Sequence, residues 1–429
     1  MRSFVADVLS VGVSKFAMIF FSLVTTIITA RFLGPEMNGI IASLIVYPSI
    51  FLSFGSLGIK QSTTFLLGQN LYKEEEIKTT ITQIWFLTTL FSLILCFVLI
   101  KFIGDNDNLT LIILAILPIP FVLFNTYNSG VFLGKNQIKE FNQINWLPTL
   151  VIFLLTILNI VILKLDVEGY LIALIGGPLV ISMLLLFKMK FFKSFSLKVN
   201  GILFKKLLGL GMIYALSLLI INLNYKFDVI MISSLSTKYE LGIYSKGSSI
   251  TEFLWQIPML LSTIVFARSA TSKNSREFSL KVCQLLRVSI VFIFLGSSFL
   301  FLFSESIIIG MFGESYKQSS QVLNNLLPGV LLLTFYKVLN MDLAGRGKPW
   351  IAIFAMLPAL IINVVLNYFL IPKYGAVGAA FASTISYSSA AIIFLIVYSL
   401  EVKISLKEIL SYSKGDFEHF SKILKWNKK

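Results

Sequence analysis

Twelve apolar segments of helix length run through the chain, and they constrain its fold more than any other feature. The hydrocarbon core of a bilayer is crossed by roughly 20 apolar residues in a helix. Of the 429 residues, 56% are hydrophobic and 13% charged, which is too apolar for a soluble chain of this size to cover its surface. The sequence therefore predicts an all-α integral membrane protein. The segments lie near 11–30, 40–58, 81–103, 109–133, 146–163, 169–187, 209–234, 244–266, 283–303, 323–344, 350–371 and 376–400.

A basic stretch, 188–206, separates the first six segments from the last six. It contains six Lys and no acidic residue. Positive charge beside spanning helices is retained on the cytoplasmic face, where anionic headgroups attract it. We therefore predict a cytoplasmic linker between two six-helix bundles, 1–187 and 207–400. A cytoplasmic tail follows at 401–429, and its apolar residues at helical spacing within 417–426 predict an amphipathic helix.

The distribution of positive charge predicts the topology. With a cytoplasmic N-terminus, 26 of the 36 Lys and Arg fall in inside segments, 6 fall in outside loops and 4 fall within spans. This asymmetry favours a multi-pass membrane protein with both termini in the cytoplasm. It also explains the net charge of +15, because the basic residues form no recognisable nucleic-acid-binding module.

Short sequence matches at one long offset indicate an internal repeat. The offsets are 203, 208 and 209 residues, close to half of the chain. They predict two homologous halves, and repeats in transporters commonly enclose the substrate path between them. The matched pairs are Gly39 with Gly242, Asn159 with Asn367, and Gly169 with Gly378.

The stretch Ala30-Arg-Phe-Leu-Gly-Pro-Glu36, just after the first segment, resembles the signature that opens bacterial polysaccharide-biosynthesis flippases. Stretches within 228–244, 343–349 and 363–380 resemble the same family at corresponding positions. Over residues 5–400 the chain is similar to Wzx-type flippases of O-antigen or capsular repeat units. Their superfamily also includes multidrug extruders and lipid II flippases.

The resemblance implies a V-shaped pair of six-helix bundles related by a pseudo-two-fold axis along the membrane normal, with a central cavity. It implies that the chain moves an undecaprenyl-diphosphate-linked oligosaccharide to the outer leaflet by alternating access. A polysaccharide polymerase and a chain-length regulator are the partners expected with such a flippase. The alternatives are a drug or cation antiporter of the same fold and, less favoured because the outside loops are short, a membrane polymerase or glycosyltransferase. No catalytic residue, cofactor or nucleic-acid partner is expected.

Lysines inside the spans are candidates for binding an anionic substrate. An intramembrane cation is costly unless it faces water or a partner, so a functional position is the first interpretation. Lysines near helix ends can instead extend to the membrane interface, which is an equal alternative for Lys15 and Lys246. Arg31 is expected at the outer mouth of the cavity or as a helix-end anchor. The full set of predicted substrate-binding residues is Lys15, Arg31, Lys226, Lys246 and Lys337.

A second candidate site would couple transport to an ion gradient. Hydropathy alone would place Asp228 outside the membrane, but the repeat offset places it within the seventh helix, on one face with Asn224. Asn363 and Asn367 share the same spacing, and Thr384 follows on the twelfth helix. Their oxygens suit a hard monovalent cation, and the resemblance implies a sodium or proton site between these helices. The alternative is that the asparagines only bond neighbouring helices.

Overall fold

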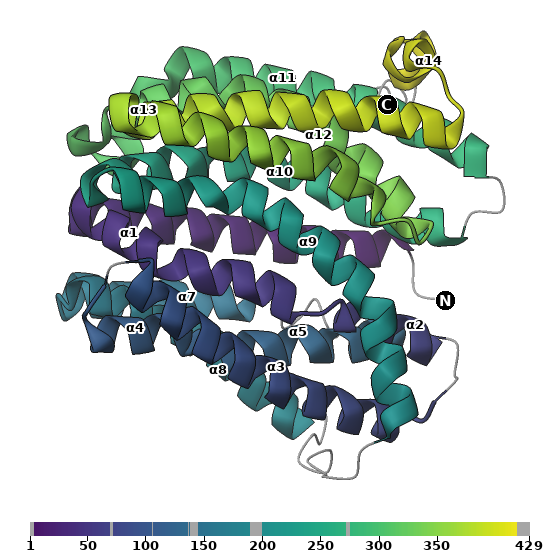
Figure 1. Ribbon diagram of the computed structural model, residues 1–429, viewed down its shortest axis with the longest axis horizontal. Helices are drawn as coiled ribbons and strands as arrows, with labels where there is room; N and C mark the ends of the chain where they lie inside the picture. Colours follow the sequence, from purple (N-terminus) through teal and green to yellow (C-terminus); the bar gives the residue numbers. More distant parts are fainter. Residues whose placement is uncertain are drawn as a thin grey trace, which may run out of the picture. The chain divides into compact units, whose positions relative to one another are not determined.

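The computed structural model describes residues 4–68, 72–104, 106–135, 137, 145–188, 200–271 and 275–417, and every regular element in this part of the chain is helical (Figure 1). The predicted all-α membrane fold is confirmed. By contacts the chain divides into two compact units, Met1–Ser245 and Lys246–Lys429, called unit 1 and unit 2 below.

Unit 1 contains both helices of membrane-spanning length and shorter ones. They are α1 (Phe4–Gly55), α2 (Ile59–Gly68), α3 (Glu74–Phe102), α4 (Leu109–Ile116), α5 (Pro118–Gly134), α7 (Leu147–Thr156), the π-helix η1 (Ile157–Ile162), α8 (Asp166–Lys188), α9 (Gly201–Leu235) and the start of α10 (Lys238–Thr271). Unit 2 holds the rest of α10, α11 (Ser275–Phe312), η3 (Glu314–Tyr316), α12 (Ser319–Gly345), α13 (Ile351–Val402), α14 (Leu406–Leu410) and η4 (Lys414–Phe417).

All twelve predicted segments fall on these helices. Within the described residues, eight helical stretches are long and apolar enough to cross a membrane. The stretches Ser14–Leu67 and Ile351–Val402 each contain two predicted segments. The breaks within them are at Gly34 (φ 71°) and Gly375 (φ 51°), where positive φ favours glycine and the helix changes direction. Two predicted spans are therefore joined at each glycine without a loop.

Local chemistry fixes several helix boundaries. The Asn108 side chain accepts hydrogen bonds from the backbone N–H groups of Thr110 and Leu111 at the start of α4, and Asn200 accepts one from Leu203 at the start of α9. Glu74, Glu75 and Glu76 open α3, where their negative charges complement the helix dipole.

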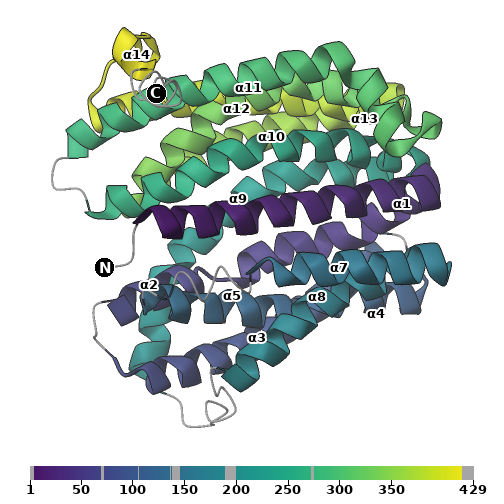
Figure 2. The same ribbon diagram turned by 180° about the vertical axis from the view of Figure 1, so that it is seen from behind.

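The division by contacts differs from the predicted domain boundaries. Helix α9 lies beside α1 in unit 1 (Figures 1 and 2), so its residues group with the first half of the chain. The predicted bundles 1–187 and 207–400 therefore stay a prediction.

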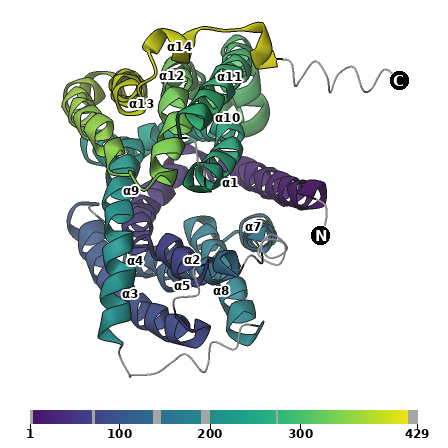
Figure 3. The same ribbon diagram turned by 90° about the vertical axis from the view of Figure 1, so that its right-hand side faces the viewer.

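Residues 189–199 of the basic linker and 418–429 of the tail lie outside the described residues. The described part of the tail forms α14 and η4 beside α11 (Figure 3).

A reciprocal contact in unit 1 supports the internal repeat. A Cβ added at Gly39 would lie 1.8 Å from the Lys238 carbonyl oxygen, and one added at Gly242 would lie 1.9 Å from the Pro35 carbonyl oxygen. Lys238 follows Pro35 by 203 residues, and Gly242 follows Gly39 by the same number. A contact in which each segment repeats the other's role is what two-fold symmetry produces. The repeat seen in the sequence is thus also a repeat in structure at this crossing.

Candidate functional site

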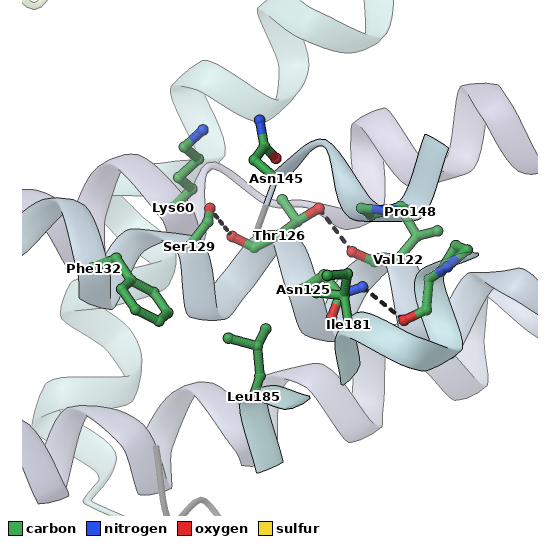
Figure 4. Close-up of a pocket in the computed structure, with 11 residues that line it drawn as sticks. Lys60, Val122, Asn125, Thr126, Ser129, Phe132, Asn145, Pro148, Ile181 and Leu185 are labelled. Carbon is green, nitrogen blue, oxygen red and sulfur yellow. Dashed lines mark hydrogen bonds between the residues drawn. The ribbon is translucent and has the colours of Figure 1, made fainter. Parts of the chain in front are cut away.

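A cavity of about 280 Å³ lies inside unit 1, between α2, α5, α7 and α8 (Figure 4). Lys60 is the one charged side chain among its described lining residues. Figure 4 shows Lys60 and Asn145 toward one side of the cavity, and Phe132 and Leu185 toward the other. The lining residues are Lys60, Val122, Asn125, Thr126, Ser129, Phe132, Asn145, Pro148, Pro178, Ile181 and Leu185.

Close packing of α2 on α5 positions Lys60. A Cβ at Gly130 would lie 2.7 Å from the Lys60 carbonyl oxygen, and one at Gly134 would lie 2.6 Å from the Cβ of Leu67. Only glycine allows the two helices to approach this closely. The Thr64 hydroxyl also donates to the Gly130 carbonyl at 3.3 Å. The half-buried Lys60 therefore lies over the turn of α5 that carries the cavity's hydroxyl groups.

Internal hydrogen bonds hold the polar wall of the cavity in place. Asn125 donates from Nδ2 to the Pro178 carbonyl at 3.0 Å, and its Oδ1 accepts the Ser182 hydroxyl at 3.0 Å. Thr126 donates to the Val122 carbonyl at 2.8 Å, and Ser129 donates to the Thr126 carbonyl at 2.6 Å. These bonds fix the direction in which the side-chain oxygens point, so the wall is pre-organised.

Positive charge concentrates at one end of this site. Lys15, half-buried on α1, is near enough to Lys60 for the two charges to repel each other. Two like charges inside apolar helices raise the free energy of the empty site, and an anion bound there would lower it. The arrangement is therefore suited to an anionic group.

The structure places the other predicted substrate-binding residues apart from this cavity's lining. Arg31 is exposed on α1, and Lys226 is half-buried on α9. In unit 2, Lys246 is buried on α10, with 7% of its surface exposed. The ammonium of Lys337, on α12, lies 4.0 Å from the centre of the Trp255 ring, a cation–π contact. Their roles in substrate binding stay predictions.

The predicted coupling residues lie in both units. On α9, which continues to Leu235, Asn224 and Asp228 are fully buried one turn apart, and Asp228 accepts a hydrogen bond from the Tyr244 hydroxyl at 2.6 Å. In unit 2, Asn367 donates to the side-chain oxygen of Asn363 at 3.0 Å, and both are fully buried.

Thr384, the other predicted coupling residue of unit 2, does not bond to this pair of asparagines. Its hydroxyl donates to the Asn325 carbonyl at 2.5 Å. The repeat offset was the better guide to Asp228 than hydropathy, since the residue lies in a helix and is buried. The role of the predicted coupling residues in binding an ion stays a prediction.

Sequence reasoning missed Lys60, which hydropathy places just after the second segment among cytoplasmic-loop charges. It also missed a fully buried carboxylate in unit 2. Asp342, on α12, accepts hydrogen bonds from Ser279 at 2.6 Å, from Tyr398 at 2.7 Å, from Ser269, and from Arg346 at 3.0 Å. The i, i+4 spacing of Asp342 and Arg346 was the available signal.

Helices of membrane-spanning length, with cations and amides buried among them, define a multi-pass membrane protein. The sequence profile described as "Polysaccharide biosynthesis protein" matches residues 4–267, and the chain belongs to this family. A second profile, MatE, matches residues 214–369.

Three similar proteins illustrate the range of the resemblance. An uncharacterized membrane protein of Methanocaldococcus jannaschii, MJ1375, is 26% identical over 388 residues, which are 86% of this chain and 91% of that protein. The Haloferax volcanii protein named "Probable low-salt glycan biosynthesis flippase Agl15" is 23% identical over 164 residues, 38% of this chain and 35% of its own length. The solved structure of the lipid II flippase MurJ, in an inward closed conformation, has a TM-score of 0.73 at 15% identity, covering 96% of this chain and 95% of that one, so its fold is the same.

Proposed function

We propose that this transporter is a flippase for undecaprenyl-diphosphate-linked oligosaccharide repeat units of the O-antigen or capsule type. It would move them by alternating access across the bacterial cytoplasmic membrane, with both of its termini in the cytoplasm. A polysaccharide polymerase and a chain-length regulator would then use the exported units.

The observation that carries this proposal is the cavity lined by Lys60 in a chain of the polysaccharide biosynthesis family. A polyprenyl tail can remain in lipid during transport. A sugar-diphosphate head cannot cross hydrocarbon unless polar, preferably cationic, groups replace its water. Lys60 and Lys15 provide such charge within apolar helices, and Asn125, Thr126 and Ser129 provide uncharged polar groups.

For energy, we propose coupling to a sodium or proton gradient. Asp228 with Asn224, and Asn363 with Asn367, are buried oxygen-bearing groups of the kind that hold a hard monovalent cation. The test is transport in proteoliposomes with an imposed sodium or proton gradient. Asp228→Asn and Asn367→Ala should lose the response to one of the two gradients, and responses equal to the parent's would place coupling elsewhere.

The match of the MatE profile to residues 214–369 favours a second candidate, a drug or cation antiporter. The two functions predict opposite results in cells that lack the protein. A flippase deletion should trap lipid-linked repeat units on the cytoplasmic leaflet and remove surface polysaccharide. An antiporter deletion should leave the polymer normal and increase sensitivity to cationic drugs.

The direct test is flipping of a fluorescent undecaprenyl-diphosphate oligosaccharide by purified protein in proteoliposomes. Parent protein should expose the labelled head to an external quencher, and Lys60→Gln should slow this exposure by about tenfold. Arg276→Gln, which changes an exposed residue at the start of α11, is the matched control and should flip as the parent does. No flipping by the parent in either gradient would contradict the proposal.

A further inference from the structure

The cavity in unit 1 combines three kinds of surface. One end carries the ammonium of Lys60, one wall carries the polar side chains of Asn125, Thr126 and Ser129, and apolar residues such as Val122 and Phe132 line other parts. Each surface restricts the ligand in a different way.

The wall formed by Thr126 and Ser129 favours a ligand that carries hydrogen-bond donors. A hydroxyl has one hydrogen to donate, and Thr126 and Ser129 already use theirs on backbone carbonyls of α5. Their oxygens are therefore left to act as acceptors. A ligand that satisfies them must carry O–H or N–H groups, and a fully ionised phosphate does not.

Asn125 adds a donor to the same wall. Its amide has two N–H groups, and the one bond from Nδ2 goes to the Pro178 carbonyl. The second N–H can donate to a ligand oxygen, while its Oδ1 lies 3.0 Å from the Ser182 hydroxyl, which the Pro178 carbonyl also approaches. A wall of fixed acceptors beside a fixed donor matches the alternating hydroxyls of a sugar.

Lys60 and the apolar residues further limit which ligands the cavity can bind. The ammonium selects for a negative group, and the neighbouring Lys15 charge strengthens that preference. Apolar side chains such as Ile181 and Leu185 suit the C–H face of a ring. A volume of about 280 Å³ is just under the roughly 300–1,000 Å³ of pockets for drug-sized molecules, so it fits one ring and its charged group rather than an oligosaccharide.

We propose that this cavity binds a single sugar ring that bears a negative group, the Lys60 ammonium pairing with the charge and Thr126, Ser129 and Asn125 bonding the ring hydroxyls. The inference rests on the flippase function proposed above and identifies which part of the substrate this cavity recognises. The negative group is either a phosphate on the ring or a ring carboxylate.

Calorimetric binding to the purified full-length protein tests this inference with four probes: glucose 1-phosphate, glucuronate, methyl α-glucoside and inorganic phosphate. At least one of the two charged sugars should bind about tenfold more tightly than both the neutral sugar and inorganic phosphate. The tighter of the two identifies the source of the charge. Equal affinity for inorganic phosphate and the charged sugars would overturn the proposal.

Variants test separately the recognition of the negative group and the recognition of the ring hydroxyls. Lys60→Gln should lower the affinity for charged sugar to that for methyl α-glucoside. Thr126→Val combined with Ser129→Ala should lower it to that for inorganic phosphate. The control is Ser289→Ala on α11. The Ser289 hydroxyl donates to a carbonyl four residues earlier, as the Thr126 hydroxyl does, and its loss should leave the affinities for charged sugar and for inorganic phosphate unchanged. Unchanged binding in folded Thr126→Val/Ser129→Ala protein would also overturn the proposal.

The flipping assay distinguishes failure of this inference from failure of the proposed function. If the parent protein flips lipid-linked oligosaccharide but the cavity variants bind and flip as it does, the flippase stands and the sugar site is wrong. If charged sugar binds as expected but the parent flips nothing, the site stands and the flippase function is wrong.

Discussion

Unit 1 and unit 2 each bury charge among apolar helices, and they do so in opposite ways. In unit 1, Lys60 lies at a cavity and beside a second positive charge, that of Lys15. In unit 2, Asp342 accepts hydrogen bonds from Arg346, from two serine hydroxyls and from a tyrosine hydroxyl. A carboxylate with this many donors is neutralised by the protein itself.

The comparison distinguishes Asp342, a charge that stabilises the fold, from Lys60, a charge proposed to bind a ligand. Breaking a satisfied buried pair leaves an uncompensated charge and destabilises the fold. Removing the charge of the half-buried Lys60 should destabilise the protein far less, although it removes an anchor for an anion. Stability and transport measured on the same variants should therefore diverge between the two sites.

The largest loss of stability is expected for Asp342→Ala. Arg346 would then be left without its carboxylate partner, at a cost of about 3–5 kcal/mol. Thermal unfolding of purified protein in detergent should show a clear fall in Tm, with Asp342→Asn, which retains the shape of the side chain, intermediate. A variant that unfolds at the parent's temperature would remove the structural interpretation of this cluster.

An ion pair that docks the tail is an intermediate case. Arg287 on α11 donates to both carboxylate oxygens of Asp416 at 2.8 and 2.7 Å, and to the carbonyls of Glu408 and Ile409 at 3.0 Å each. Tyr412 also bonds the Arg287 carbonyl, at 3.4 Å. One arginine therefore holds residues on either side of Ser411 against α11.

Replacing Arg287 by Ala should release the tail, with a loss of about 1.5–3 kcal/mol from this docked segment. Limited proteolysis at Lys407, on α14, measures the release directly. Lys281→Gln, which breaks the exposed i, i+4 pair with Glu277 on the same helix, is the control and should leave proteolysis unchanged. Equal cleavage of Arg287→Ala and parent would contradict the docking role.

The same contact predicts a pH dependence. The hydrogen bonds from Arg287 hold the pKa of Asp416 below its ordinary value of 3.8. A lowered pKa contributes stability that is fully present above 3.8 and is lost as the pH falls through the lower value of the folded state. The tail should therefore stay docked at pH 5 and be released only under stronger acid, which proteolysis by an acid-active protease can follow. Release already at pH 5 would contradict this assignment.

The smallest loss of stability is expected for Lys60→Gln. Because the cost of burying the Lys60 charge is removed, together with the smaller repulsion from Lys15, Tm should stay nearly the same or rise, whereas flipping should fall by about tenfold. Thermal unfolding and flipping are measured on the same preparation. A fall in Tm as large as that of Asp342→Ala would show that Lys60 is a structural residue.

The amino-acid sequence by itself determined the all-α membrane fold and the positions of the spans. Apolar length is a property of the chain alone, since the bilayer requires it of each helix separately. The repeat offset likewise placed Asp228 inside a helix, where hydropathy would not. The reciprocal contacts of Gly39 and Gly242 follow from the same offset.

Only the tertiary structure decided which charges share a site. Lys60 lies near a helix end in the sequence and was counted as a loop charge, yet Gly130 lets α5 approach α2 and brings Thr126 and Ser129 to the same cavity. Asp342 became a satisfied anion only because Ser279 and Tyr398, from α11 and α13, meet it. Such groupings depend on contacts between residues far apart in the chain, and hydropathy and spacing report only on neighbours within one helix.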